Sequence, residues 1–182
     1  MLVFEKPGKE NTAETVRLAV QVAKERGIRH LVVASNRGGT AKMIENADGL
    51  NVVIVTQHAG FSAPNTVAMQ PEVRAELEGM GYKVLCTGHV LSGAERGLSR
   101  RFQGVSPVEV MAYTLRMLSQ GTKVAVEVAT MAADAGLIPV GEPVIAVGGT
   151  GGGADSALIL HAANANNILD TKIQEILCKP YI

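Results

Sequence analysis

Short apolar runs and longer amphipathic stretches alternate along this chain. The stretch TAETVRLAVQVAKER (12–26) places Val16, Val20 and Ala23 on one face of a helix, and Gly27 follows as a stop. A helix with one apolar face buries that face against a core. The pattern therefore predicts an amphipathic helix close to the N-terminus.

Four short apolar runs have the pattern of buried strands. They lack polar alternation, as parallel strands do when helices cover both faces of their sheet. The runs are HLVVAS (30–35), NVVIVT (51–56), YKVLCT (82–87) and PVIAVG (143–148). Further helices are predicted at 40–47, 70–80, 107–118, 122–136 and 154–164, and the alternating segment TKIQEILCK (171–179) predicts an edge strand. Strands that alternate with helices predict one doubly wound α/β domain over residues 1–182.

The composition of the chain argues against several classes of binding partner and against a metal site. Seventeen basic and seventeen acidic residues cancel, so we expect neither nucleic acid nor a membrane surface as a partner, and any anion site must be local. Cys86 and Cys178 form no CxxC pair, and the four histidines lack metal-ligand spacing to them, so we expect reduced thiols and no metal. The chain has no secretory apolar core and no stretch of about 18 apolar residues. We expect a cytoplasmic protein.

Two glycine-rich stretches follow buried strands and precede expected helices. They are ASNRGGTAKM (34–43) and AVGGTGGGADSALIL (146–160). Both would lie at the carboxyl ends of parallel strands, where unpaired helix N–H groups attract phosphate. The candidate ligand-binding residues are Ser35, Asn36, Arg37, Gly38, Gly39, Thr40, Thr56, His58, Gly148, Gly149, Thr150, Gly151, Gly152, Gly153 and Asp155.

Known phosphate motifs match the second stretch incompletely. A P-loop pattern starting at Gly148 has Ala154 in place of its lysine, which disfavours nucleoside triphosphatase chemistry. Gly149, Gly151 and Ala154 match a dinucleotide fingerprint, but Asp170 precedes the last strand instead of ending the next one. A tight turn that serves only close helix–strand packing is the alternative to a phosphate site.

Longer motifs in this chain resemble a known family. FEKPGKENT, TQHAGF, EVATMAADAG and AVGGTGGGADSA resemble a stand-alone archaeal and bacterial family of proteins like the pyruvate kinase C-terminal α/β domain. The resemblance implies three α/β/α layers and a mostly parallel five-stranded sheet of order 3-2-1-4-5, with the last strand antiparallel. It also implies flavin mononucleotide (FMN) as a cofactor, and the pyruvate kinase domain itself binds the phosphate of a sugar effector. No barrel domain is recognisable in this sequence, so we expect no pyruvate kinase activity.

Two histidines and one arginine-rich segment are further candidates. His58 and His89 follow the second and third strands, where each would act as a general acid or base or make ordinary hydrogen bonds. Arg96, Arg100 and Arg101 lie in a predicted long loop (92–104), which would be either a solvated loop or a lid over a phosphate.

Several polar residues near the carboxyl ends of the strands have structural roles as an alternative to ligand binding. Lys123, Glu127, Thr130 and Asp134 form one stripe of an otherwise apolar helix, which predicts a solvent face with Lys123 and Glu127 paired. Asp155 would repel a phosphate, so we expect it to cap the following helix or to accept hydrogen bonds from ribityl hydroxyls.

Two functions follow from these observations. The first is an FMN-binding protein that acts as a small oxidoreductase, with the phosphate held by the glycine-rich turns. The second is a non-catalytic sensor or regulatory module for a phosphorylated metabolite. In both, the partner is a small phosphorylated ligand, and the sequence leaves the oligomeric state open, a homo-oligomer included.

Overall fold

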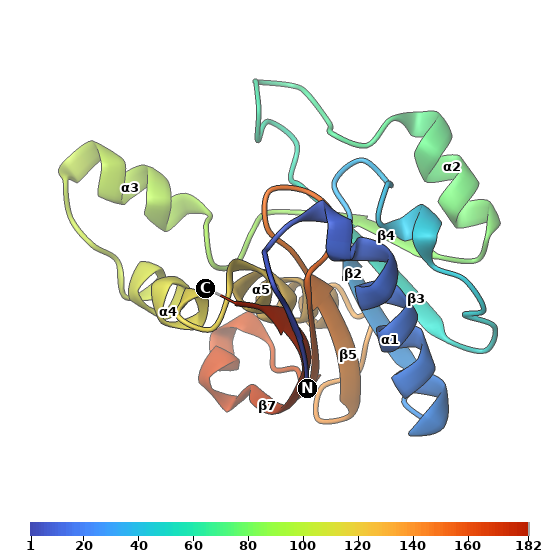
Figure 1. The fold of residues 1–182 in the computed structure, drawn as a ribbon. Helices are drawn as coiled ribbons and strands as arrows, with labels where there is room; N and C mark the ends of the chain where they lie inside the picture. Colours follow the sequence, from blue (N-terminus) through green and yellow to red (C-terminus); the bar gives the residue numbers. More distant parts are fainter. Residues whose placement is uncertain (182) are drawn as a thin grey trace.

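The protein forms three layers, with one seven-stranded sheet between two layers of helices (Figure 1). The structure is a computed structural model and describes residues 1–181. The sheet order is β1-β7-β6-β5-β2-β3-β4. The strands are β1 (Leu2–Phe4), β2 (His30–Ala34), β3 (Asn51–Thr56), β4 (Lys83–Cys86), β5 (Pro143–Gly148), β6 (Ser156–His161) and β7 (Lys172–Pro180). The predicted three-layer, mostly parallel α/β fold is confirmed.

Helices cover both faces of the sheet. The helices are α1 (Thr12–Glu25), α2 (Pro71–Gly79), α3 (Ala94–Phe102), α4 (Pro107–Arg116) and α5 (Gln120–Asp134), with short 3-10 turns η1 (Lys9–Asn11), η2 (Ala41–Met43) and η3 (Ala165–Asp170). Successive strand residues point to opposite faces. Leu31 and Val33 therefore pack in the core beneath α1 and α2, while Val32 packs beneath α5. The helix α4 packs on α5, and α3 projects from the body of the molecule (Figure 1).

The central strands have the predicted order. The pairs β2–β3, β3–β4 and β2–β5 are parallel, so β4, β3, β2 and β5 reproduce the predicted order 3-2-1-4. The strand β6 is antiparallel to both of its neighbours, β5 and β7. The predicted edge strand over 171–179 forms β7, but it does not lie at the edge of the sheet, because it pairs with β6 on one side and with β1 on the other.

The predicted helix over 154–164 is wrong, because this segment contains β6. Residues 156–160 are buried without interruption. A central strand can bury consecutive residues because helices cover both of its faces, whereas a surface helix buries one stripe. The sheet therefore has seven strands instead of five, since neither β6 nor the three-residue β1 was expected.

Two other local predictions also differ from the structure. The predicted helix over 40–47 is reduced to η2, because Ile44 is extended and Asn46 has a positive φ of 54°. The predicted loop over 92–104 contains the helix α3. Within residues 1–181, no helix combines the length and apolarity needed to cross a membrane.

Candidate functional site

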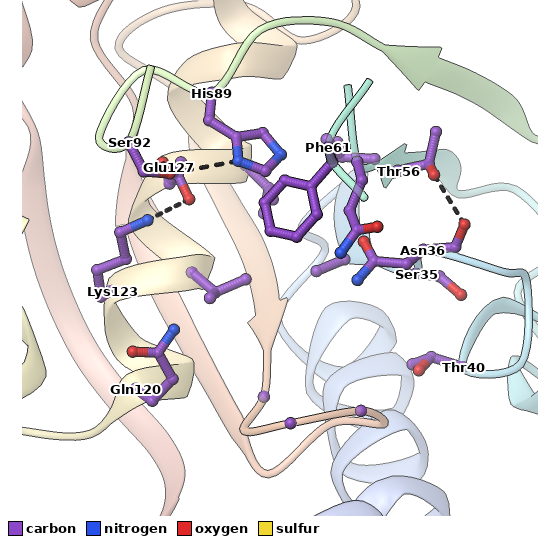
Figure 2. A pocket seen from close by; sticks show the side chains of 18 of the residues that line it. Ser35, Asn36, Thr40, Thr56, Phe61, His89, Ser92, Gln120, Lys123 and Glu127 are labelled. Atoms are coloured by element: carbon purple, nitrogen blue, oxygen red, sulfur yellow. Dashed lines mark hydrogen bonds and ion pairs between the residues drawn. The ribbon is translucent and has the colours of Figure 1, made fainter. Parts of the chain in front are cut away.

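A cavity of about 600 Å³ lies at the carboxyl ends of β2, β3 and β5. The turn after β2 forms one wall, the N-terminal half of α5 forms the opposite wall, and the glycine turn after β5 lies between them (Figure 2). Both glycine-rich turns contribute to this one cavity. The candidate residues that line the cavity are Ser35, Asn36, Arg37, Gly39, Thr40, Thr56, His89, Gly149, Gly151, Gly152 and Gly153.

The turn after β2 is fixed by its own polar groups. The backbone N–H of Ala41 donates to Ser35 Oγ at 3.2 Å, and Thr56 Oγ1 donates to the carbonyl of Asn36 at 2.8 Å. Gly38 has a φ of +89°, and a Cβ there would lie 2.4 Å from Val73 Cγ1. Glycine is required at this position, both for the backbone conformation and for close packing on α2.

The glycine turn after β5 leads into a strand. It connects β5 to the antiparallel β6, so the expected helix N-terminus is absent from this turn. Gly151, Gly152 and Gly153 all have positive φ values. The backbone N–H of Ala154 donates to Thr12 Oγ1 at 3.0 Å, which anchors the turn to the start of α1.

Both turns present backbone donors to the cavity. Within residues 1–181, the N–H groups of Gly39, Thr40, Gly151 and Gly152 donate no hydrogen bond. Successive free N–H groups in a turn can bind an anion without a helix dipole. Neither turn opens an α-helix, so the predicted attraction by two helix N-termini is corrected to an attraction by turn N–H groups. The helix end at the cavity is instead the first turn of α5, which contributes Gln120 and Lys123.

Five candidate residues do not line the cavity: Gly38, His58, Gly148, Thr150 and Asp155. Asp155 is fully buried and accepts hydrogen bonds from the backbone N–H of Gly8 at 3.1 Å and from Ser156 Oγ at 2.9 Å. It precedes a strand, so the predicted helix cap is wrong. A Cβ at Gly148 would lie 2.2 Å from the carbonyl oxygen of Gly121, so this glycine allows α5 to approach the sheet.

Three of the four residues in the polar stripe of α5, Lys123, Glu127 and Thr130, are buried, against the prediction of a solvent face. The side chains of Lys123 and Glu127 are 3% and 6% exposed, and the predicted pairing is confirmed at an Nζ–Oε2 distance of 2.5 Å. Glu127 Oε1 also accepts from the backbone N–H of Leu91 at 2.9 Å and from Ser92 Oγ at 3.3 Å. Burial lowers the pKa of Lys123, and the charge of Glu127 opposes that shift.

The rest of the stripe divides between core and surface. Thr130 is buried, and its Oγ1 has no hydrogen-bond partner within residues 1–181. Asp134 is exposed and accepts from Asn164 Nδ2 at 3.0 Å. A sequence signal for the inward-facing stripe existed, because nearly all other positions of this helix are apolar. A helix that is apolar around most of its circumference is buried on most sides, including its polar stripe.

The two candidate histidines lie side by side, and only His89 lines the cavity. Their ring centroids are 5.0 Å apart, and the ring of Phe61 lies 5.5 Å from His58 and 5.6 Å from His89. Burial lowers the pKa of His89, while the nearby charge of Glu127 opposes the shift. His89 and Phe61 line the cavity, and the sequence analysis did not select Phe61.

Cations predominate among the charged side chains of the cavity. Its described lining includes Arg37, Arg96, Arg116 and Lys123 against the single carboxylate Glu127. Arg100 and Arg101, the other arginines of the predicted lid, do not line it. Arg116 was not selected from the sequence, because only the packing of α4 on α5 places it here. The cavity is therefore a local positive region in a chain of zero net charge.

The described residues form no metal centre. Within residues 1–181 there is no group of three or more His, Cys, Asp or Glu side chains that could hold a metal ion. The cavity instead offers backbone N–H groups, hydroxyls, cationic side chains and aromatic rings. These groups suit an anionic organic ligand with a planar or apolar part.

Comparison with known proteins gives one family and several similar structures. The family model described as pyruvate kinase, alpha/beta domain, matches residues 13–160. Two solved structures of Cryptosporidium parvum pyruvate kinase are 16% identical to this chain and cover 84% and 87% of it, with TM-scores of 0.45 and 0.43. A third, in complex with ADP, is 17% identical, covers 89% and has a TM-score of 0.39. The chain spans 23% of the length of each of these pyruvate kinases.

Proposed function

The chain belongs to the pyruvate kinase alpha/beta domain family, and from this premise we propose that its cavity binds a phosphorylated organic ligand, with FMN as the first candidate. One observation carries the proposal. Four cationic side chains and one carboxylate line a cavity between two turns with free N–H groups, in a chain of zero net charge. Such a lining favours an anion over a neutral ligand.

We place the phosphate at the turn after β2. Thr40 is 6% exposed, lines the cavity and lies beside the free N–H of Gly39. Arg37 of the same turn supplies a cation. Hydrogen bonds to a charged group contribute about 1.5–3 kcal/mol each, so a few of them account for useful affinity. The glycine turn after β5 forms the floor beneath the rest of the ligand.

The rest of the cavity suits the organic part of the ligand. Phe61 and His89 offer aromatic surface, as an isoalloxazine ring requires. Lys123 has three N–H donors and one hydrogen-bond partner, Glu127, within residues 1–181. A ligand carbonyl would satisfy a donor that is otherwise buried. A volume of about 600 Å³ is within the usual range for an organic ligand.

The test is an FMN titration with two matched variants. Thr40 and Thr150 lie in the two glycine-rich turns, but only Thr40 is in the cavity lining. We expect wild-type protein to quench FMN fluorescence, Thr40→Val to weaken binding roughly tenfold or more, and Thr150→Val to leave it unchanged. Riboflavin, which lacks the phosphate, should bind more weakly than FMN. A protein that neither quenches FMN nor gains thermal stability from it would contradict flavin binding.

A second function, a sensor for a phosphorylated metabolite, is favoured by the same positive cavity. Within residues 1–181, neither His58 nor His89 has a hydrogen bond to a carboxylate. His58 Nδ1 contacts the carbonyl of Ala59 at 2.7 Å, and His89 Nδ1 contacts Ser92 Oγ at 3.3 Å. This arrangement favours a sensor over an enzyme that uses either histidine as an acid or base. A ligand that binds only the native state raises the melting temperature. A rise with sugar phosphates but not with FMN would support the sensor. Bound FMN that nicotinamide cofactors reduce would support an oxidoreductase.

A further inference from the structure

The surface of α3, α4 and the segment between them carries many exposed apolar side chains, beside the charged residues Glu95, Arg96, Arg100 and Arg101 of α3. Every residue of α3 is at least partly exposed, although Ala94, Leu98 and Phe102 form an apolar stripe at helical spacing. We call this surface the α3–α4 face. Its large apolar side chains and their exposed fractions are Leu98 59%, Phe102 75%, Val105 76%, Val110 56%, Tyr113 68%, Met117 73% and Leu118 38%.

The α3–α4 face combines a projection with a groove. Phe102 stands at the end of the projecting α3 (Figure 1). A groove of about 560 Å³ lies beside it, lined largely by Val105, Val110, Tyr113 and Met117. A surface that carries both a projecting side chain and a receiving groove can be complementary to itself. Two-fold pairing requires this self-complementarity, because the same surface contributes from both copies.

The area of the face matches that of a stable dimer. From the exposed fractions, the seven side chains present roughly 800 Å², which is close to the area that one partner contributes to a standard protein–protein interface. Contiguous apolar patches larger than a few hundred Å² are uncommon on monomers. The chain also has only three Phe and three Tyr, and two of these six residues lie on this face.

We propose that the α3–α4 face pairs with the α3–α4 face of a second copy of this chain, with Phe102 of each copy entering the groove of the other. Burying the apolar stripe of α3 would supply the packing that this helix lacks within its own chain. Arg96 of the same helix lines the cavity, so pairing would also hold one cation at the cavity. The pairing itself needs no ligand, and its test is therefore independent of the proposed function.

Sedimentation velocity over a range of concentrations tests the proposal. We expect a species of twice the 19.1 kDa chain mass. Phe102→Glu and Tyr113→Glu should each weaken dimerisation by about 30-fold or more, as central aromatic residues of an interface do. Leu169→Glu is the matched control, because Leu169 is 83% exposed and lies in η3, outside the α3–α4 face. It should leave dimerisation unchanged.

Three outcomes would overturn the proposal. One is a wild-type monomer at every concentration up to the solubility limit. Another is a dimer that persists in both Phe102→Glu and Tyr113→Glu. The third is a dimer that Leu169→Glu weakens as much as those two substitutions do. Because all three positions are exposed, circular dichroism should show folded protein in each variant.

Discussion

Two ion pairs with the same spacing occupy very different surroundings. Lys123–Glu127 on α5 and Arg74–Glu78 on α2 are both separated by four residues, with N–O distances of 2.5 and 2.8 Å. The side chains of the first pair are 3% and 6% exposed, and those of the second are 46% exposed each. The spacing alone predicts contact in both cases. It does not predict whether the contact is made in water or beside a cavity.

Burial changes what an ion pair contributes. An exposed pair adds at most about 1 kcal/mol, since water and salt screen it. A buried pair loses the hydration of both ions, and its attraction often does no more than offset that loss. Glu127 is compensated further by the backbone N–H of Leu91 and by Ser92 Oγ. A buried pair at a cavity wall, with little net value for stability, is typical of a functional site.

The largest difference between the pairs should come from removing one carboxylate. Glu127→Ala leaves the charge of Lys123 and the N–H of Leu91 without partners in a buried site, so we expect a loss of about 3–5 kcal/mol in the free energy of unfolding. Glu78→Ala should cost less than about 1 kcal/mol. Urea denaturation of both variants measures the two losses. Equal losses would show that the two environments do not differ as the structure indicates.

Replacing both members of each pair sharpens the comparison. In the double variant Lys123→Met, Glu127→Leu no buried charge remains unpaired, so we expect it to be at least about 2 kcal/mol more stable than Glu127→Leu alone, which leaves the charge of Lys123 unpaired. For the surface pair, Arg74→Met and Glu78→Leu should have effects that add within about 0.5 kcal/mol. Double-mutant cycles in urea provide both values. If the effects of the two buried substitutions on the free energy of unfolding simply add, Lys123 and Glu127 are not coupled as described above.

The smallest expected effect is a pH dependence beside the buried pair. Burial lowers the pKa of His89 below its ordinary value of 6.5, so between the two values the unfolded state binds more protons. Stability from this group is therefore present above pH 6.5 and decreases as the pH falls toward the folded pKa, by at most about 1.4 kcal/mol per pH unit. His89→Gln should flatten the slope of the urea midpoint against pH below 6.5. An unchanged slope would exclude His89 as its source.

Much of the sheet could be predicted from local patterns. Apolar runs located β2 to β5, and the stripe of Val16, Val20 and Ala23 located α1. The segment of β6 could not be assigned in this way, because a short buried run following glycines is compatible with either a helix or a strand. Its strand pairing with β5 and β7 decided the matter. For the same reason the glycine turn, predicted to begin a helix, instead connects the strands β5 and β6.

The candidate site was predicted in part for the same reason. Position at the carboxyl ends of strands correctly brought Thr40 and Gly151 to one cavity, because parallel strands share that edge. The contributions of Arg116 and of the Lys123–Glu127 pair arise from helices that pack beside this edge, and helix orientation is set by contacts far apart in the sequence.

The sequence by itself determined which segments are apolar enough to be buried, where the glycines permit positive φ, and that the chain carries no net charge. These properties depend on composition and on neighbours along the chain. Only the tertiary structure decided the strand identity of 156–161, the burial of Lys123 with Glu127, and the gathering of four cations around one cavity. Each of these depends on which surfaces meet, and local spacing carries no information about that.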